Sequence, residues 1–484
     1  MDGQVSNVKR IGLVLGPGLA GLMLLLGAPE GLSFAAWATG ALMVWMATWW
    51  ATEPIPIPVT SMLPLVVLPL IGAGTAREAA AGYSHPIVLL LLGGFIIALG
   101  IERWGLHKRI ALNVVAWIGS SPGTLILGFM LATAALSMWI SNTATTLMMV
   151  PIALSAAAAL KDDTGRFTIA LLLGVCYAAS IGGIATPIGT PTNLIAIGWL
   201  TDNTGIGISF WTWMKFGIPA VLLLVPAAWW SVTRGLPRLT NASEAIAEVR
   251  RQKAGLGAMT TPERRVAIVF GLVALIWVTR TRVQSFAAEQ GWDFPALMAV
   301  NDMGIAVAGA VVMFLVPSGK GEGRAGRALL NWEEAVKLPW GVLLLFGGGI
   351  TLGQAVTRTG LSTWLGEQLS TLSTLPPIFF IAVVVAMVIF LTELTSNVAT
   401  MTTLAPVLGV LATAVGVAPA SLLAPAAVAA SCAFMLPVAT APNAIIYATG
   451  EVSIGQMMHR GLMVNLIGIA IITAIGFWLA PLVL

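Results

Sequence analysis

Two short polar stretches of the chain have nearly the same sequence and contain residue types that bind small ions and ligands. Residues 141–145 read Ser-Asn-Thr-Ala-Thr, and residues 396–400 read Ser-Asn-Val-Ala-Thr. A proline follows each stretch at the same distance, at Pro151 and Pro406. Hydroxyl and amide groups are costly in apolar surroundings unless they bind one another or a ligand. The duplication therefore predicts one central binding site that is built from two equivalent halves.

Each half of the chain also contains a second polar stretch. Residues 187–193 read Pro-Ile-Gly-Thr-Pro-Thr-Asn, and residues 437–443 read Pro-Val-Ala-Thr-Ala-Pro-Asn. Both interrupt an apolar segment, which predicts a broken helix. The N–H groups at such a break favour anions, whereas its carbonyl and amide oxygens favour a hard cation such as Na⁺. The alternative is that these residues only join helices by hydrogen bonds, but the ordered pairing of four stretches favours a site.

The composition places these stretches in a membrane protein. The chain has 484 residues, of which 58% are hydrophobic and 9% are charged, and its mean hydropathy is +0.93. Soluble proteins carry about 25% charged residues. Apolar runs of roughly 20 residues recur along the whole chain, which predicts an all-α polytopic membrane protein rather than a β-barrel.

The net charge of +4 does not indicate a nucleic-acid partner, because the basic residues lie in short loops. Such loops are typical of the cytoplasmic side of a membrane protein. Lys9 and Arg10 precede the first apolar run, and no convincing cleavage site follows it. We therefore expect a retained first helix, a cytoplasmic N-terminus and a multi-pass protein of the bacterial inner (plasma) membrane, in contact with lipid.

The length of the apolar runs predicts the individual helices. Single helices are expected at about 8–27, 33–51, 57–73, 85–101, 209–232, 265–281, 303–316, 339–357 and 460–482. Four divisions are predicted: an N-terminal helix in 1–32, a first repeat in 33–232, a cytoplasmic linker in 233–264 and a second repeat in 265–484. The first repeat is expected to contain a re-entrant hairpin at about 123–160 and a broken helix at about 166–200. The second is expected to contain a re-entrant hairpin at about 377–416 and a broken helix at about 420–450. A second basic linker is expected at 317–337.

The two repeats are predicted to have opposite orientations in the membrane. Gly93-Gly94 in the first repeat matches Gly347-Gly348 in the second, and further matched residues follow in the same order. An even number of apolar segments separates the two matched helices, so the second helix crosses in the opposite direction. The expected fold has about eleven transmembrane helices, two re-entrant hairpins and two inverted-topology repeats.

The remaining polar residues do not indicate a further binding or catalytic site. Glu393 lies one helical turn before Asn397, and its counterpart in the first repeat is Met138, so it lies outside the symmetric site. We favour a structural carboxylate there over a proton carrier. Glu53 and Asp302 are interpreted as helix-boundary residues. Cys176 and Cys432 are expected to be free thiols, and His85, His107 and His459 lack metal-site spacing. A membrane-embedded enzyme is a remote alternative, because no catalytic pair is evident, and a channel is disfavoured because no continuous polar path is evident.

The paired Ser-Asn stretches, residues 433–443 and the Thr-Glu-Pro-Ile-Pro at 52–56 resemble the divalent-anion/sodium symporter family, over about residues 30–484. This resemblance implies Na⁺-coupled transport of small dicarboxylates such as succinate, malate or fumarate, with no organic cofactor. It also implies a homodimer with a scaffold domain and an elevator-type transport domain, hinged at 102–112 and 357–372. A sodium-independent dicarboxylate exchanger and a sulfate or citrate carrier of the same family remain alternatives.

The resemblance also implies roles for individual residues. The implied residues are Ser137, Ser141, Asn142 and Gly189 for a first Na⁺ site, Thr392, Thr395, Asn397 and Ala439 for a second, and Asn142, Thr143, Thr190, Ser396, Asn397 and Thr440 for the substrate. Val398 stands where the second signature often has Thr, which leaves the identity of the substrate open. No Arg or Lys lies at this site, so Na⁺ and helix-end dipoles would have to balance the charge of an anion.

Overall fold

The computed structural model describes residues 7–118, 121–160, 164–236, 242–292, 294–319, 328–369 and 376–484. Helices dominate these residues, and no β-strand occurs among them. Nine helices in the described ranges are long and apolar enough to cross a membrane. The predicted all-α membrane fold is thus confirmed, while the number of crossings stays a prediction.

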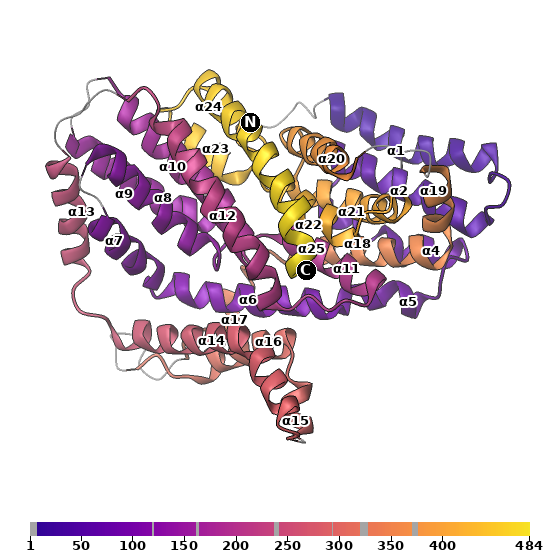
Figure 1. The fold of residues 1–484 in the computed structure, drawn as a ribbon, viewed down its shortest axis with the longest axis horizontal. Helices are drawn as coiled ribbons and strands as arrows, with labels where there is room; N and C mark the ends of the chain where they lie inside the picture. Colours follow the sequence, from indigo (N-terminus) through magenta and orange to yellow (C-terminus); the bar gives the residue numbers. More distant parts are fainter. Residues whose placement is uncertain are drawn as a thin grey trace.

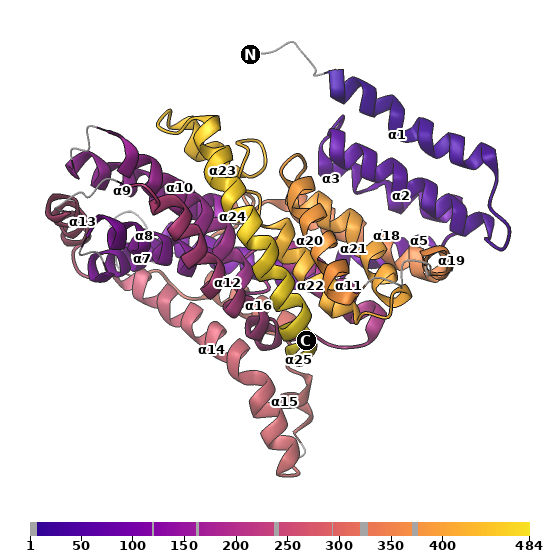
Figure 2. The same cartoon turned by 45° about the horizontal axis from the view of Figure 1, so that its top comes forward.

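The N-terminal part forms a peripheral helix pair and a long apolar helix that follows several short helices. Its helices are α1 (Asn7–Leu26), α2 (Phe34–Thr52), α3 (Ile57–Thr60), α4 (Leu63–Leu70), α5 (Ala76–Ala81), α6 (Pro86–Arg103) and α7 (Leu106–Ile118). Helices α1 and α2 pack together at one edge of the molecule (Figures 1 and 2). The single helix predicted at 57–73 is wrong, because α3 and α4 are separate. Pro64 lies in the first turn of α4, where its missing N–H group costs nothing.

The next helices show the breaks that the polar stretches predict. They are α8 (Pro122–Ser137), α9 (Asn142–Leu160), α10 (Arg166–Gly182), α11 (Pro191–Thr204) and α12 (Phe210–Thr233). Helix α10 is almost wholly buried and packs against α8, α9 and α12. The break between α10 and α11 is therefore held in the interior of the protein.

The middle of the chain is more helical than expected. It contains α13 (Ser243–Gly255), α14 (Thr261–Glu289), α15 (Pro295–Ala299), α16 (Asp302–Leu315) and α17 (Trp332–Ala335). The predicted linker 233–264 contains α13, and the helix predicted at 265–281 begins earlier and ends later. Thr260 and Glu263 form a capping box that starts α14, with Pro262 in its first turn rather than in a loop. Helices α14 and α15 project from the body (Figure 2).

The last part repeats the earlier pattern of hairpin and broken helix. Its elements are α18 (Trp340–Arg358), α19 (Leu361–Leu369), α20 (Pro377–Thr392), α21 (Asn397–Ala414), α22 (Pro419–Ala430), α23 (Ala441–Ala448), α24 (Ile454–Ala474), a π-helical turn η4 (Ile475–Leu479) and α25 (Ala480–Val483). Helices α9 and α21 begin at the two equivalent asparagines. Of the predicted second linker, residues 320–327 lie outside the described ranges. The same is true of residues 370–372 of the predicted second hinge.

Candidate functional site

The four polar stretches meet at one cavity of about 1120 Å³. Residues 141–143 and 188–191 line it from the first half of the chain, and residues 394–398 and 438–442 line it from the second half. Ten of the twelve predicted site residues are among the lining residues. The other two, Ser137 and Thr392, lie behind the wall of the cavity.

Ser137 and Thr392 make equivalent contacts with the two asparagines. The Ser137 hydroxyl lies 2.7 Å from Asn142 Oδ1 and 2.6 Å from the Ala179 carbonyl. In the second half, the Thr392 hydroxyl lies 2.7 Å from Asn397 Oδ1 and 3.0 Å from the carbonyl of residue 430. A hydroxyl has one proton for two oxygen neighbours. Each cluster therefore gathers three oxygens around a single proton, an arrangement that a small hard cation would stabilise.

Two glycines bring the backbone close to the first oxygen cluster. A Cβ atom at Gly183 would lie 2.8 Å from Asn142 Oδ1 and 2.9 Å from the Gly189 carbonyl oxygen. The Gly189 oxygen and the Asn142 amide therefore converge on the same point of the chain. Alanine occupies both equivalent positions in the second half, Ala433 and Ala439. Sequence reasoning named Gly189 but missed Gly183, although its position just before the break was an available signal.

The last asparagine of each Pro-x-small-Thr-x-x-Asn stretch stabilises the break. Asn193 Nδ2 donates to the carbonyls of Gly183 at 3.0 Å and Thr186 at 2.7 Å. Asn443 Nδ2 donates to the carbonyls of Ala433 at 3.0 Å and Leu436 at 2.8 Å. A helix break leaves carbonyls without partners; Asn443 satisfies two of them, and Asn193 satisfies three, since it also donates to the Ile184 carbonyl at 3.3 Å. These two residues position the site but do not line the cavity.

Glu393 supports the second half of the site from behind. Its carboxylate accepts backbone N–H groups of Phe434, Met435 and Leu436 at 2.8–3.1 Å, and the Asn465 amide at 2.8 Å. The side chain is buried. These contacts agree with the structural carboxylate favoured from the sequence, and the role of Asn465 was missed. Glu393 therefore fixes the segment that leads to Ala439 and Thr440.

Charged residues also line the cavity, away from the polar stretches. They are Lys9, Glu53, Glu102 and Lys337. Glu53 ends α2 in the left-handed conformation, with a φ of 47°, so its expected place at a helix boundary is confirmed. The two lysines were not predicted. The absence of a fixed base thus applies to the polar stretches and not to the whole cavity.

Comparisons with known proteins agree with this arrangement. A family model described as "Sodium:sulfate symporter transmembrane region" matches residues 8–484. The "Sodium-dependent dicarboxylate transporter SdcS" of Staphylococcus saprophyticus is 41% identical, covering 100% of this chain and 94% of that protein. The protein of the same name from Staphylococcus aureus strain MRSA252 is also 41% identical, covering 99% of this chain and 92% of its own length.

Two solved transporter structures are similar in fold. The YdaH transporter of Alcanivorax borkumensis matches with a TM-score of 0.59 and 15% identity, over 98% of each chain. MtrF of Neisseria gonorrhoeae matches with a TM-score of 0.58 and 14% identity, over 99% of this chain and 95% of that one. At this identity the likeness concerns the fold alone.

Proposed function

The chain belongs to the sodium:sulfate symporter family, and from that premise we propose that it is a secondary active transporter that moves small dicarboxylates across the membrane together with Na⁺. One observation supports the proposal more strongly than the others. Two equivalent oxygen clusters, at Asn142 and Asn397, face one cavity from the two halves of the chain. The names of the Staphylococcus relatives support the same substrate and the same coupling ion.

Four helix N-termini explain how the cavity could hold an anion without a fixed base at the polar stretches. Helices α9, α11, α21 and α23 begin at Asn142, Pro191, Asn397 and Ala441, and all four residues line the cavity. A helix N-terminus carries a partial positive charge, and a bound Na⁺ would add a full one. A dianion and Na⁺ would each lower the cost of burying the other, so the two should bind together.

The residues present fit two Na⁺ sites, because hydroxyl, amide and carbonyl oxygens are the ligands of a hard cation. The proposed ligands are Ser137, Ser141, Asn142 and Gly189 for one ion, and Thr392, Thr395, Asn397 and Ala439 for the other. The proposed substrate contacts are Asn142, Thr143, Thr190, Ser396, Asn397 and Thr440. When bound, Na⁺ supplies the positive charge that the substrate carboxylates need.

We propose that transport follows from inverted repeats and an elevator motion in a homodimer. In this scheme α8–α12 and α20–α24 carry the site, and α1–α6 and α14–α18 form the scaffold. Lys9 and Lys337 belong to the basic segments assigned to the cytoplasm, and both line the cavity. These two lysines support the proposal that the site is open to the cytoplasm in this state.

Uptake of radiolabelled succinate into proteoliposomes tests the function directly. We expect uptake above background with an inward Na⁺ gradient and loss of uptake when choline replaces Na⁺, because both oxygen clusters need a cation. Equal uptake in choline, when the vesicles contain unlabelled dicarboxylate, would instead support a sodium-independent exchanger. No uptake under either condition would reject the proposal.

The apolar side chain of Val398 in the cavity wall predicts which anions the protein prefers to transport. Unlabelled succinate, malate or fumarate should compete with labelled succinate, and sulfate should compete weakly or not at all. The apolar side chain suits the centre of a C4 dicarboxylate and penalises a tetrahedral oxyanion that needs donors on every side. Val398→Thr should shift the preference among carboxylates while transport persists. Strong inhibition by sulfate without inhibition by any C4 dicarboxylate would overturn this assignment.

The close approach at Gly183 predicts a defect in Na⁺ binding. Gly183→Ala would place a methyl group 2.8 Å from Asn142 Oδ1, so the amide must move away from the oxygen cluster. We expect the Na⁺ concentration for half-maximal uptake to rise roughly 10- to 100-fold, as when a ligand's supporting contacts are lost. Gly271→Ala on α14 is the matched control, because its Cβ meets no atom within 4 Å. An unchanged Na⁺ dependence in Gly183→Ala would argue against this first site.

A further inference from the structure

We infer that Asp202 and Asn203, at the end of α11, form a latch that closes the side of the protein opposite the cavity and stabilises the inward-open state. Their partners are His85 before α6 and Gln354 and Thr357 near the end of α18. The inference rests on the proposed elevator motion, in which α11 moves relative to α6 and α18.

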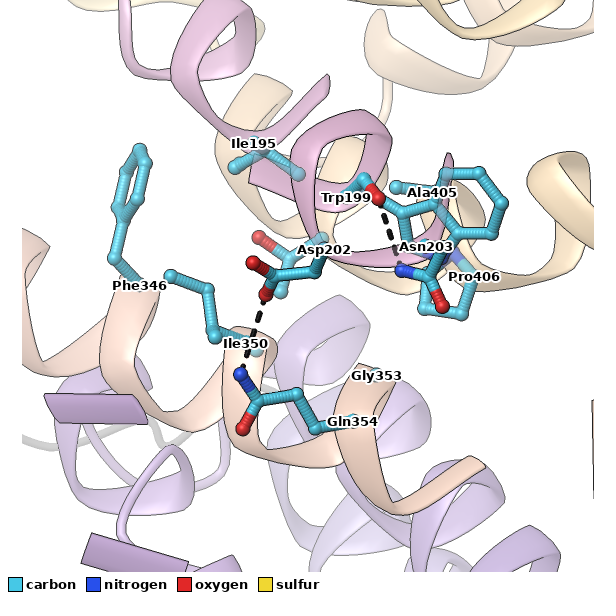
Figure 3. Close-up of a pocket in the computed structure, with 12 residues that line it drawn as sticks. Ile195, Trp199, Asp202, Asn203, Phe346, Ile350, Gly353, Gln354, Ala405 and Pro406 are labelled. Atoms are coloured by element: carbon cyan, nitrogen blue, oxygen red, sulfur yellow. Dashed lines mark hydrogen bonds between the residues drawn. The ribbon is translucent and has the colours of Figure 1, made fainter. Parts of the chain in front are cut away.

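The latch consists of three polar contacts between elements far apart in the chain. Asp202 Oδ1 lies 3.1 Å from His85 Nε2, and Asp202 Oδ2 accepts the Gln354 amide at 3.2 Å. The Thr357 hydroxyl donates to Asn203 Oδ1 at 2.7 Å. Figure 3 shows Asp202 and Gln354 facing each other across the gap between α11 and α18. One helix end is therefore fastened at two adjacent residues.

The orientation of His85 favours its contact with Asp202. His85 precedes α6, and its Nδ1 accepts the Ile87 N–H at 3.3 Å. The proton of a neutral ring must then be on Nε2, which donates to the carboxylate. The His85 and Asp202 side chains are 15% and 22% exposed, so solvent screens their contact only in part.

The apolar packing beside the latch is incomplete. A cavity of about 30 Å³ lies between α11, α18 and α21, lined by residues that include Trp199, Phe346 and Ile350 as well as Asp202 and Gln354 (Figure 3). Side chains next to a void lose dispersion contacts on that side. The polar contacts of the latch therefore supplement packing that is incomplete at this point of the boundary.

The two contacts of Asp202 have no equivalent at the other end of the pseudo-symmetric fold. When the Gly-Gly pairs of α6 and α18 are matched, Gln354 corresponds to Gly100 and His85 to Pro339. When the two Pro-x-small-Thr-x-x-Asn stretches are matched, Asp202 corresponds to Val452. None of these three counterparts can form a charged or side-chain hydrogen-bonded contact, whereas the counterparts of Thr357 and Asn203 are Arg103 and Ser453, which can.

The two ends of the fold also differ in the contacts they make. Helix α11 packs against α18, whereas the large cavity lies between α6, at Ala98 and Glu102, and the start of α23, at Ala441 and Pro442. Opening the latched end requires its three contacts to break, and closing the other end forms no equivalent of the two contacts made by Asp202. The two contacts of Asp202 therefore stabilise the inward-open state without stabilising the opposite state.

Thiol labelling of the full-length protein tests the shift in populations. Leu99 lines the cavity from α6, so Leu99→Cys reports how often the inner side is open to a membrane-impermeant maleimide. The native Cys176 and Cys432 are buried and should react little. Asp202→Ala in this background should lower the ratio of inward-open to other states about fivefold or more, the lower end of typical coupling between states, and labelling should slow in proportion to the loss of the inward-open population. His85→Ala should do the same, and the double variant should add little to either single change.

Glu451→Gln is the matched control, because it removes an exposed acid just after α23, and none of the ion pairs among the described residues involves it. Its labelling rate should equal that of the Leu99→Cys parent. Labelling of Asp202→Ala at the parent rate would overturn the latch. The assay needs no substrate, so a slowed rate in a protein that takes up no succinate would reject the proposed function and leave the latch standing.

A disulfide across the latch tests whether it must open during transport. In Asn203→Cys/Thr357→Cys, oxidation should abolish Na⁺-driven succinate uptake, and a reductant should restore it. Each single-cysteine variant, oxidised in the same way, should keep its activity. Full uptake by the oxidised pair, or failure of the two cysteines to react with each other, would contradict a contact that forms in one state and breaks in the other.

Discussion

Replacing either Asn142 or Asn397 with alanine is expected to reduce Na⁺-driven succinate uptake by about 100-fold or more while the protein stays folded. Each amide oxygen lies 2.7 Å from the hydroxyl behind it, on Ser137 or Thr392, and each asparagine also lines the cavity. Loss of either one removes a proposed ligand of Na⁺ and of the substrate together. Loss of supporting contacts alone costs about 10- to 100-fold in metal affinity, and loss of a direct ligand should cost more.

The measurement is initial uptake at saturating Na⁺ and succinate, with thermal unfolding as the test of folding. Asn113→Ala is a suitable control, because Asn113 is an asparagine on α7 whose amide bonds to the backbone of its own helix, at the Arg109 carbonyl. It should transport like the parent protein. Normal uptake by either site variant would mean that one half suffices, and the model of a duplicated site would fail.

The repeated polar stretches of the sequence predicted which residues lie together at the centre of the protein, and the reason is physical. A polar stretch within an apolar chain must be satisfied locally, and the same stretch in both halves imposes the same local solution. Ser137 with Asn142, and Thr392 with Asn397, are pairs only five residues apart along the chain. Contacts of this range follow from spacing along a helix and its end, so they can be read from one sequence.

Contacts between distant elements could not be predicted in this way. Glu393 meets Asn465 across 72 residues, and His85 meets Asp202 across 117 residues. The local sequence around each residue does not mark it as half of a contact, because the contact forms only when the helices pack together. The lysines of the cavity were missed for the same reason.

The prediction of helices from hydropathy also failed where the helices are short or polar. It merged α3 and α4 into one segment, because the break between them, Ser61 and Met62, is only two residues long and lies between apolar runs. It assigned α13 to a linker, although a polar helix is stable when one face is buried, as Ala245, Ile246 and Val249 are here.

Glu393→Ala is expected to destabilise the protein and to abolish transport. The carboxylate accepts four different N–H donors, three from the backbone of residues 434–436 and one from Asn465. Alanine would leave these donors buried without a partner, at a cost of about 3–5 kcal/mol, similar to breaking a buried ion pair. The segment that leads to Ala439 and Thr440 should then lose its fixed conformation, and thermal unfolding should begin at a clearly lower temperature than in Glu451→Ala.

Glu393→Gln separates a structural carboxylate from a proton carrier. The glutamine side chain has one acceptor oxygen, and its amide nitrogen would face backbone donors, so a structural role predicts partial loss of both stability and uptake. A proton carrier predicts the opposite pattern, in which the variant keeps its thermal stability but loses the pH dependence of uptake. The count of donors favours the first outcome, since four N–H groups already occupy both carboxylate oxygens and leave no room for a transferable proton. Parallel scans of thermal unfolding and of uptake against pH would decide between the two roles.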